Sequence, residues 1–173
     1  MTQIQHLYEI VKTLRSENGC PWDRQQTHMS LKPECIEEAA EVISGINIYE
    51  KTGDAENLKE ELGDLLLQVM FHSVIAEEEG LFTFDDVAQI VSEKMIRRHP
   101  HVFSGVTYNS KEEQHDAWEA IKAEEKAGKE WHEQYLRDAF TESSKLIEQA
   151  KERKGFSNNY KTRDNGRYDA GTC

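Results

Sequence analysis

The sequence predicts an all-α protein, a helical bundle that the association of subunits completes. Three prolines and ten glycines are few for 173 residues. Long runs are rich in Glu, Ala, Leu and Lys, which favours helices over a sandwich or a parallel sheet. A hydrophobic content of 37% is low but sufficient for one domain with a core.

The first two helices flank a predicted loop. Apolar residues recur at three- and four-residue steps, which predicts a helix over about residues 2–17, namely at Ile4, Leu7, Val11 and Leu14. Asn18 and Gly19 end this helix, and residues 20–30 form a loop. Ser30 is expected to cap a second helix that runs to about residue 50.

A third helix is predicted from about residue 55 to 79, after a turn at Gly53. From Leu62 to Ile75 it is apolar on nearly every side, so we expect it to be central and buried. The short connection to the second helix favours an antiparallel pair.

Three further helices complete the prediction. Thr83 caps a fourth that ends near His99, because Pro100 disfavours helix in the residue before it. Ser110 and Glu113 form a capping box for a fifth helix that Gly128 ends. The last helix covers residues 131–154, and the tail over 155–173 lacks periodicity and is expected to be disordered.

The charge and the cysteines restrict the classes of function. A net charge of −12 disfavours a nucleic acid polymer or an anionic membrane as partner. The N-terminal residues do not have the pattern of a signal peptide, and no stretch has membrane-spanning length. Cys20, Cys35 and Cys173 lack metal-motif spacing. They fit free thiols, so we expect a cytoplasmic protein.

Two acidic pairs predict a divalent-metal site. Glu38 and Glu41 lie on the second helix, and Glu61 and Asp64 lie on the third. Each pair has i,i+3 spacing, so an antiparallel arrangement brings four carboxylates together, which suits Mg²⁺ or Mn²⁺. Acidic helix residues are commonly solvated, but two matched pairs, one in an apolar helix, favour a metal. Neither acidic helix has the Glu-x-x-His pair of di-iron sites, and His72 is expected to be a satisfied core or interface histidine.

A basic patch and a loop tryptophan suggest a nucleotide. Lys94 and Arg98 belong to a dense basic patch in an acidic chain, and such groups recognise phosphate. The same residues also suit a helix C-terminus, and both interpretations can hold. Trp22 beside Asp23 offers a stacking face and a hydrogen-bond acceptor, as base recognition requires, although Trp22 can equally be a core residue under the loop.

Taken together, an ordered series of motifs over about residues 1–126 resembles the MazG-type nucleoside triphosphate pyrophosphohydrolases, the all-α NTP pyrophosphatase group. The motifs are Cys20-Pro21-Trp22-Asp23, Glu37-Glu38-Ala39-Ala40-Glu41, Glu60-Glu61-Leu62-Gly63-Asp64 and Arg97-Arg98-His99-Pro100-His101. The resemblance implies hydrolysis of a nucleoside triphosphate (NTP or dNTP) to the monophosphate and pyrophosphate, in nucleotide-pool house-cleaning. It also implies a homodimer or homotetramer.

The resemblance assigns roles to residues of this sequence. It implies that Glu38, Glu41, Glu61 and Asp64 bind Mg²⁺, with Mn²⁺ as a substitute. Glu37 completes the acidic motif, and we expect this or another motif carboxylate to accept the proton of the attacking water. The resemblance makes Lys94 and Arg98 the phosphate-contacting pair. Trp118 and Lys122, four residues apart, match positions near the nucleotide.

Beyond Lys126 the sequence departs from the family pattern, because the usual Asp-Gly-rich loop and Pro-Ala-Leu-Leu-type helix are missing. We therefore predict a MazG-like catalytic domain over residues 1–127, a divergent helix over 128–154 and the tail over 155–173. Two alternatives remain at this stage. One is a pyrophosphatase specific for dUTP or dCTP, and the other is a non-catalytic helical module that senses nucleotide or metal.

Overall fold

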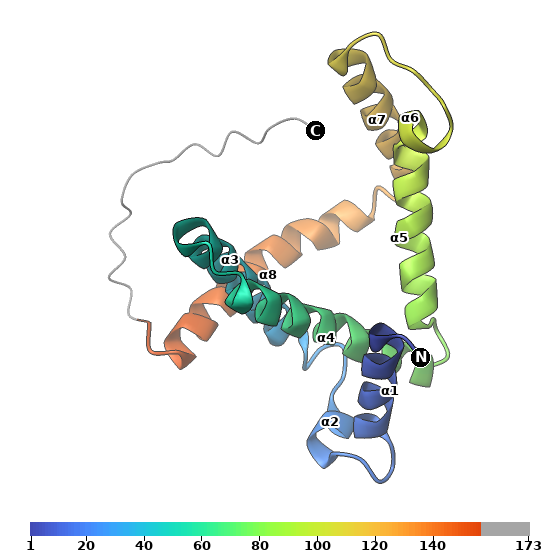
Figure 1. Cartoon of the computed structure of the whole chain (residues 1–173). Coiled ribbons are helices and arrows are strands. Elements are labelled where there is room, and N and C mark those ends of the chain that lie inside the picture. The colour runs from blue at the N-terminus through green and yellow to red at the C-terminus, as the bar shows by residue number, and fades with distance from the viewer. Residues whose placement is uncertain (157–173) are drawn as a thin grey trace. The chain divides into compact units, whose positions relative to one another are not determined.

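The computed structural model describes residues 1–156, and within them it contains eight helices and no strand, which confirms the predicted all-α class (Figure 1). The predicted disordered tail falls outside the described residues, apart from Gly155 and Phe156. The helices are α1 (Gln3–Arg15), α2 (Pro21–Gln25), α3 (Lys32–Thr52), α4 (Glu56–Glu78), α5 (Phe84–Arg98), α6 (Pro100–Phe103), α7 (Lys111–Lys126) and α8 (His132–Arg153).

The chain divides into two compact units. Of the described residues, unit 1 comprises 1–89 and 143–150, and unit 2 comprises 90–142 and 151–156. Among the helices of residues 1–156, none combines the length and the apolar character that a bilayer-spanning helix requires. The predicted domain boundaries at residues 127 and 154 stay a prediction.

The core of unit 1 lies between α1, the start of α3 and the second half of α4. Its buried side chains are those of Val11, Leu31, Met70, Phe71, Val74 and Ile75. Thr2 begins α1 with a capping box, in which its hydroxyl accepts from the Gln5 amide and the Gln5 side chain accepts from the Thr2 amide. The periodicity of α1 thus places Val11 in the core, as the sequence predicts.

The helices α3 and α4 form an antiparallel hairpin and lie side by side (Figure 1). Gly53 ends α3 with a φ of 75°, the left-handed conformation that a helix C-terminus favours and that glycine adopts without strain. Gly45 is buried on α3, and a Cβ atom there would lie 2.8 Å from the Cα atom of Leu58. The two helices therefore approach closely at Gly45, which fixes their relative register.

The structure corrects three predictions. Ser30 does not cap α3, because Leu31 occupies the N-cap position and the Ser30 hydroxyl donates instead to the Gln26 side chain at 2.7 Å. The predicted loop over 20–30 contains the short helix α2. The helix α4 is buried mainly over residues 68–76, whereas Leu62 is 50% exposed. The sequence of α4 is thus apolar on nearly every side from Leu62 to Ile75, but only the second half of the helix is buried.

Unit 2 contains most of α5 together with α6 and α7. Pro100 starts the four-residue helix α6, which the sequence did not predict. Ser110 caps α7 as predicted, because its hydroxyl accepts from the Glu113 amide at 3.1 Å. In a capping box the Glu113 carboxylate would accept from the backbone amide of the cap residue, Ser110. It accepts instead from the backbone amide of Asn109, one residue earlier, at 2.6 Å.

Candidate functional site

Three carboxylates converge between α3 and α4 in unit 1. Glu38 on α3 and Glu61 and Asp64 on α4 each offer one ligand atom, and these atoms lie within 4.8 Å of one another. All three residues are half-buried. The i,i+3 spacing on α4 and the antiparallel hairpin produce this convergence, as the sequence reasoning anticipated. We call Glu38, Glu61 and Asp64 the acidic cluster.

The acidic cluster suits a hard divalent cation. Burial, followed in order of importance by the negative charges of Glu41, Asp64, Glu34 and Glu61, raises the pKa of Glu38 to about 7. Carboxylate oxygens at this spacing are the ligands that Mg²⁺ accepts. The donor set of oxygen atoms and the unscreened charge therefore fit Mg²⁺ or Mn²⁺.

Glu41 and Glu37 lie on α3 beside the acidic cluster. Both are half-buried. Glu41 is close enough to influence the pKa of Glu38, although it is not one of the three residues whose ligand atoms converge. The structure thus brings together three of the four predicted ligands and places the fourth one turn further along α3.

Asn57 is a residue of this site that the sequence reasoning missed. Its side-chain amide donates to the Glu61 carboxylate at 2.8 Å. The i,i+4 spacing between Asn57 and Glu61 on α4 is the signal that would have found it. The bond leaves the second carboxylate oxygen of Glu61 for a ligand and restricts the rotation of the side chain.

The predicted residues of unit 2 form a second group. The guanidinium carbon of Arg98 lies 5.9 Å from the centre of the Trp118 ring, and the Lys122 Nζ atom lies 4.0 Å from it. Lys94 is half-buried on α5, one turn before Arg98. The spacing of Trp118 and Lys122 on α7 therefore produces a cation–π contact.

Glu125 on α7 pairs with two arginines of the basic patch, and the sequence pattern did not predict this pairing. Arg98 donates to its Oε2 atom through Nε at 3.0 Å and through Nη2 at 2.5 Å, and Arg97 donates to its Oε1 atom. These hydrogen bonds, with that from Arg98 the most important, lower the pKa of Glu125 to about 2. The pairing uses two of the three nitrogens of Arg98 and leaves Nη1 for another acceptor.

Trp22 and Asp23 lie on α2 in unit 1. Trp22 is 60% exposed, which excludes the alternative of a core residue under the loop, whereas Asp23 is 9% exposed. His72 is half-buried and has partners on both ring nitrogens, with Nδ1 2.7 Å from His28 Nδ1 and Nε2 3.2 Å from Cys35 Sγ. His72 is therefore the satisfied histidine that we predicted.

Comparisons with known proteins agree with these motifs. Residues 26–103 match the model of the MazG nucleotide pyrophosphohydrolase domain. The chain is 52% identical over 128 residues to the nucleoside triphosphate pyrophosphohydrolase/pyrophosphatase MazG of Thermotoga maritima, which covers 72% of this chain and 46% of that protein.

Two further relatives carry a similar name. The chain is 44% identical over 133 residues to the nucleoside triphosphate pyrophosphohydrolase of Escherichia coli K12, covering 76% of this chain and 49% of that protein. It is 45% identical over 111 residues to the protein of that name in Mycobacterium tuberculosis, and this match covers 63% of this chain and 33% of that protein. The chain spans about half the length, or less, of the curated relatives it matches. Through the domain over residues 26–103, the chain belongs to the MazG family.

Proposed function

We propose that the chain hydrolyses nucleoside triphosphates between the α and β phosphates, which yields the monophosphate and pyrophosphate. The observation that carries the proposal is the acidic cluster, whose three ligand atoms lie within 4.8 Å of one another. Membership of the MazG family supports it. The proposal extends to this chain an activity for which relatives about twice its length are named.

The acidic cluster would hold Mg²⁺, which Mn²⁺ can replace, and Glu41 would complete the ligand set. When bound, the ion supplies positive charge for the triphosphate and polarises water. Glu37 lies next to Glu38 on α3 and would accept the proton of the attacking water. Asn57 holds Glu61 in one orientation through its 2.8 Å hydrogen bond, so the ligand is oriented before the substrate arrives.

The remaining predicted residues would bind the nucleotide. Lys94 and Arg98 would neutralise the leaving pyrophosphate, for which Arg98 has its Nη1 group available. Trp22, which is 60% exposed, offers a stacking surface, and Trp118 with Lys122 offers a second aromatic and cationic pair. The carboxylate of Asp23 would accept from the base or sugar.

We further propose that the protein acts in the cytoplasm on the nucleotide pool, as a homodimer or homotetramer. The large apolar side chains that remain exposed on α3 and α4 support an association of subunits, because a single chain leaves them in water. They are Ile43, Ile46, Ile48, Tyr49, Leu62 and Val69.

A panel assay tests the proposed function. The purified chain is incubated with each NTP and dNTP and with Mg²⁺, and pyrophosphate and monophosphate are measured separately. Equal amounts of the two products are expected, whereas release of orthophosphate would contradict cleavage between the α and β phosphates. Turnover of dUTP or dCTP alone would identify the pyrimidine-specific alternative. Nucleotide binding without turnover would identify a sensing module.

A further inference from the structure

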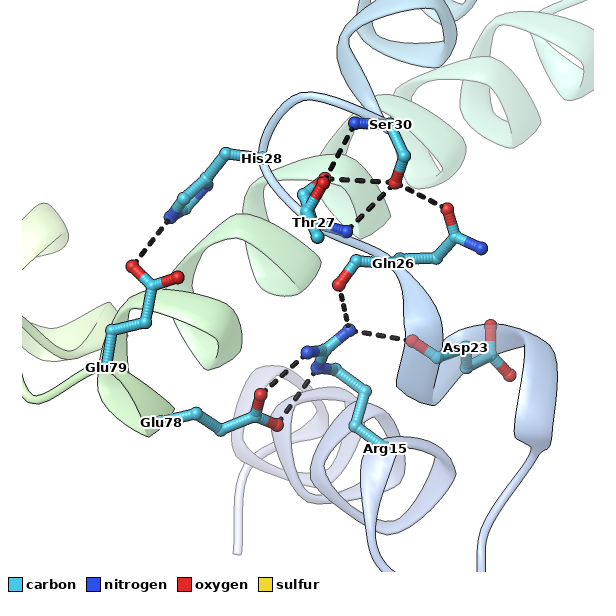
Figure 2. Close-up of polar contacts among 8 residues, drawn as sticks. All are labelled: Arg15, Asp23, Gln26, Thr27, His28, Ser30, Glu78 and Glu79. Carbon is cyan, nitrogen blue, oxygen red and sulfur yellow. Dashed lines mark hydrogen bonds and ion pairs between the residues drawn. The ribbon is translucent and has the colours of Figure 1, made fainter.

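A single buried arginine joins the C-terminal ends of three helices of unit 1 (Figure 2). Arg15 is the last residue of α1 and is 8% exposed. Its Nε and Nη2 atoms donate to the two carboxylate oxygens of Glu78, the last residue of α4, at 2.9 and 2.6 Å. Its Nη1 atom donates to the carbonyl oxygens of Asp23 and Gln26, at 2.7 and 3.0 Å. The guanidinium therefore attaches α2 to both longer helices.

Other hydrogen bonds attach α2 only to the end of α1 and the turn after it, from Arg24 to the Glu17 carbonyl at 2.7 Å and from the Cys20 amide to the Leu14 carbonyl at 2.8 Å, whereas Arg15 also links it to α4. The helix α2 is five residues long, and only Asp23 within it is buried. Carbonyl groups at the end of a helix tend to lack partners within the helix, and Arg15 donates to two of them, the Gln26 carbonyl and the Asp23 carbonyl, the second of which also accepts from the Gln26 amide at 3.2 Å. Arginine suits the position because its planar, permanently charged fork serves a carboxylate and further acceptors at once.

The attached segment presents two groups suited to a nucleotide. The Asp23 carboxylate points away from Arg15 (Figure 2) and makes no hydrogen bond with another residue of the described chain, although the residue is buried. Its oxygens still reach solvent, because they are not among the fully buried polar atoms that lack a partner in the described chain, so N–H or O–H donors of a base or sugar can approach them. The neighbouring Trp22 is 60% exposed and has a free face for stacking.

We infer that Arg15, through its bidentate pair with Glu78, is a positioning residue that holds Trp22 and Asp23 in place for the base or sugar of the nucleotide. Arg15 touches no substrate itself in this role. The inference rests on the proposed function, since it concerns the binding of that substrate.

The test compares Arg15→Lys with a matched control. Lysine keeps the charge but cannot form the bidentate pair and reach both carbonyl groups together. The control is Lys12→Met, because the Lys12–Glu77 ion pair also joins α1 to α4, at 3.0 Å, and does not involve α2. Both variants thus weaken the packing of α1 on α4, and only the first removes hydrogen bonds to α2.

Two measurements decide the outcome. The first is the affinity for a non-hydrolysable α,β-methylene nucleoside triphosphate, measured by calorimetry with Mg²⁺. The second is the hydrogen exchange of the Arg24 and Gln26 amides, which donate within α2 to Cys20 and Asp23. We expect Arg15→Lys to lower the affinity about tenfold or more and to speed exchange at both amides, while Lys12→Met changes neither.

Several results would overturn the inference. One is wild-type affinity in Arg15→Lys, another is unchanged exchange in α2, and a third is an equal loss of affinity in Lys12→Met. If the wild-type chain binds the analogue but releases no pyrophosphate from any NTP, the proposed function fails while the inference is still judged by these measurements. A wild-type chain that does not bind the analogue overturns both.

A second variant covers the case in which Arg15→Lys does not fold. Glu78→Gln removes the charge from the exposed partner of the pair, whose side chain is 45% exposed, and keeps the shape of the side chain. It is expected to lower the affinity for the analogue in the same direction, with unchanged helical content by circular dichroism. A folded Glu78→Gln variant with wild-type affinity and wild-type exchange in α2 would contradict the role of the pair.

Discussion

Glu38 is the residue at which the charges of the acidic cluster act on one another. Its pKa is raised to about 7, first by burial and then by four neighbouring carboxylates. In the metal-free chain a proton therefore occupies this site up to nearly neutral pH. A divalent cation competes with that proton, so binding of metal releases it. The predicted metal site is thus coupled to pH through one side chain.

The first prediction concerns the stability of the metal-free protein. Between the usual pKa of a glutamate, 4.5, and the raised value of about 7, the folded state binds more protons at Glu38 than the unfolded state. Stability from this group is therefore present below pH 4.5 and is lost as the pH rises towards 7. Thermal unfolding in a chelator is measured at about pH 5 and about pH 7.5. Glu38→Gln is expected to gain stability relative to wild type at the higher pH, and parallel behaviour of the two proteins would contradict this.

The second prediction concerns turnover. Glu61→Gln removes a charged ligand atom of the acidic cluster, so pyrophosphate release at saturating Mg²⁺ is expected to fall about 100-fold or more. The fold is expected to remain, because the substitution removes repulsion in the metal-free state and keeps an oxygen for Asn57. Glu60→Gln is the matched control, since Glu60 is the exposed neighbour. Wild-type turnover in Glu61→Gln would refute the assignment.

At the scale of elements, local patterns predicted which segments are helical, and tertiary packing decided the rest. The apolar spacing of Ile4 to Leu14 was sufficient for α1, because one side of that helix meets the core. The short helix α2 escaped prediction because it has five residues and too few positions for a periodic pattern, and because part of its support comes from Arg15, a residue of another helix. In the same way, i,i+3 spacing predicted the carboxylates that converge, whereas Glu125 is 27 residues from Arg98 and only folding brings them together.

The third prediction concerns the approach of α3 to α4. Gly45→Ala places a Cβ atom 2.8 Å from the Leu58 backbone, so the helices must separate, and the free energy of unfolding is expected to fall by about 1 to 3 kcal/mol. Gly63→Ala on α4 is the control, because a Cβ atom there meets nothing within 4 Å. It is expected to raise the free energy of unfolding by about 0.5 to 1 kcal/mol through helix propensity. Denaturant unfolding of both variants measures the difference, and a neutral Gly45→Ala would contradict the close approach.

At the scale of the whole molecule, the surface combines strong negative charge with exposed apolar side chains. The net charge of −12 opposes the association of copies at long range. The exposed side chains on α3 and α4 favour it at short range, and Leu62 and Val69 lie on one side of α4 because they are seven residues apart. Salt screens the repulsion and leaves the hydrophobic contribution, so the predicted subunit association is expected to strengthen as ionic strength rises.

The last prediction tests that association by placing a charge on the exposed apolar surface of α3. Ile46 is 49% exposed, and glutamate retains good helix propensity, so Ile46→Glu is expected to disrupt subunit contacts without unfolding α3. Ile4→Glu is the control, because Ile4 is 42% exposed on α1, outside the α3 and α4 hairpin. Sedimentation at micromolar concentration is expected to show a dimer or tetramer for wild type and Ile4→Glu, and mostly monomer for Ile46→Glu. A stable wild-type monomer would refute the association. If Ile46→Glu assembles like the wild type, the interface does not include this surface of α3.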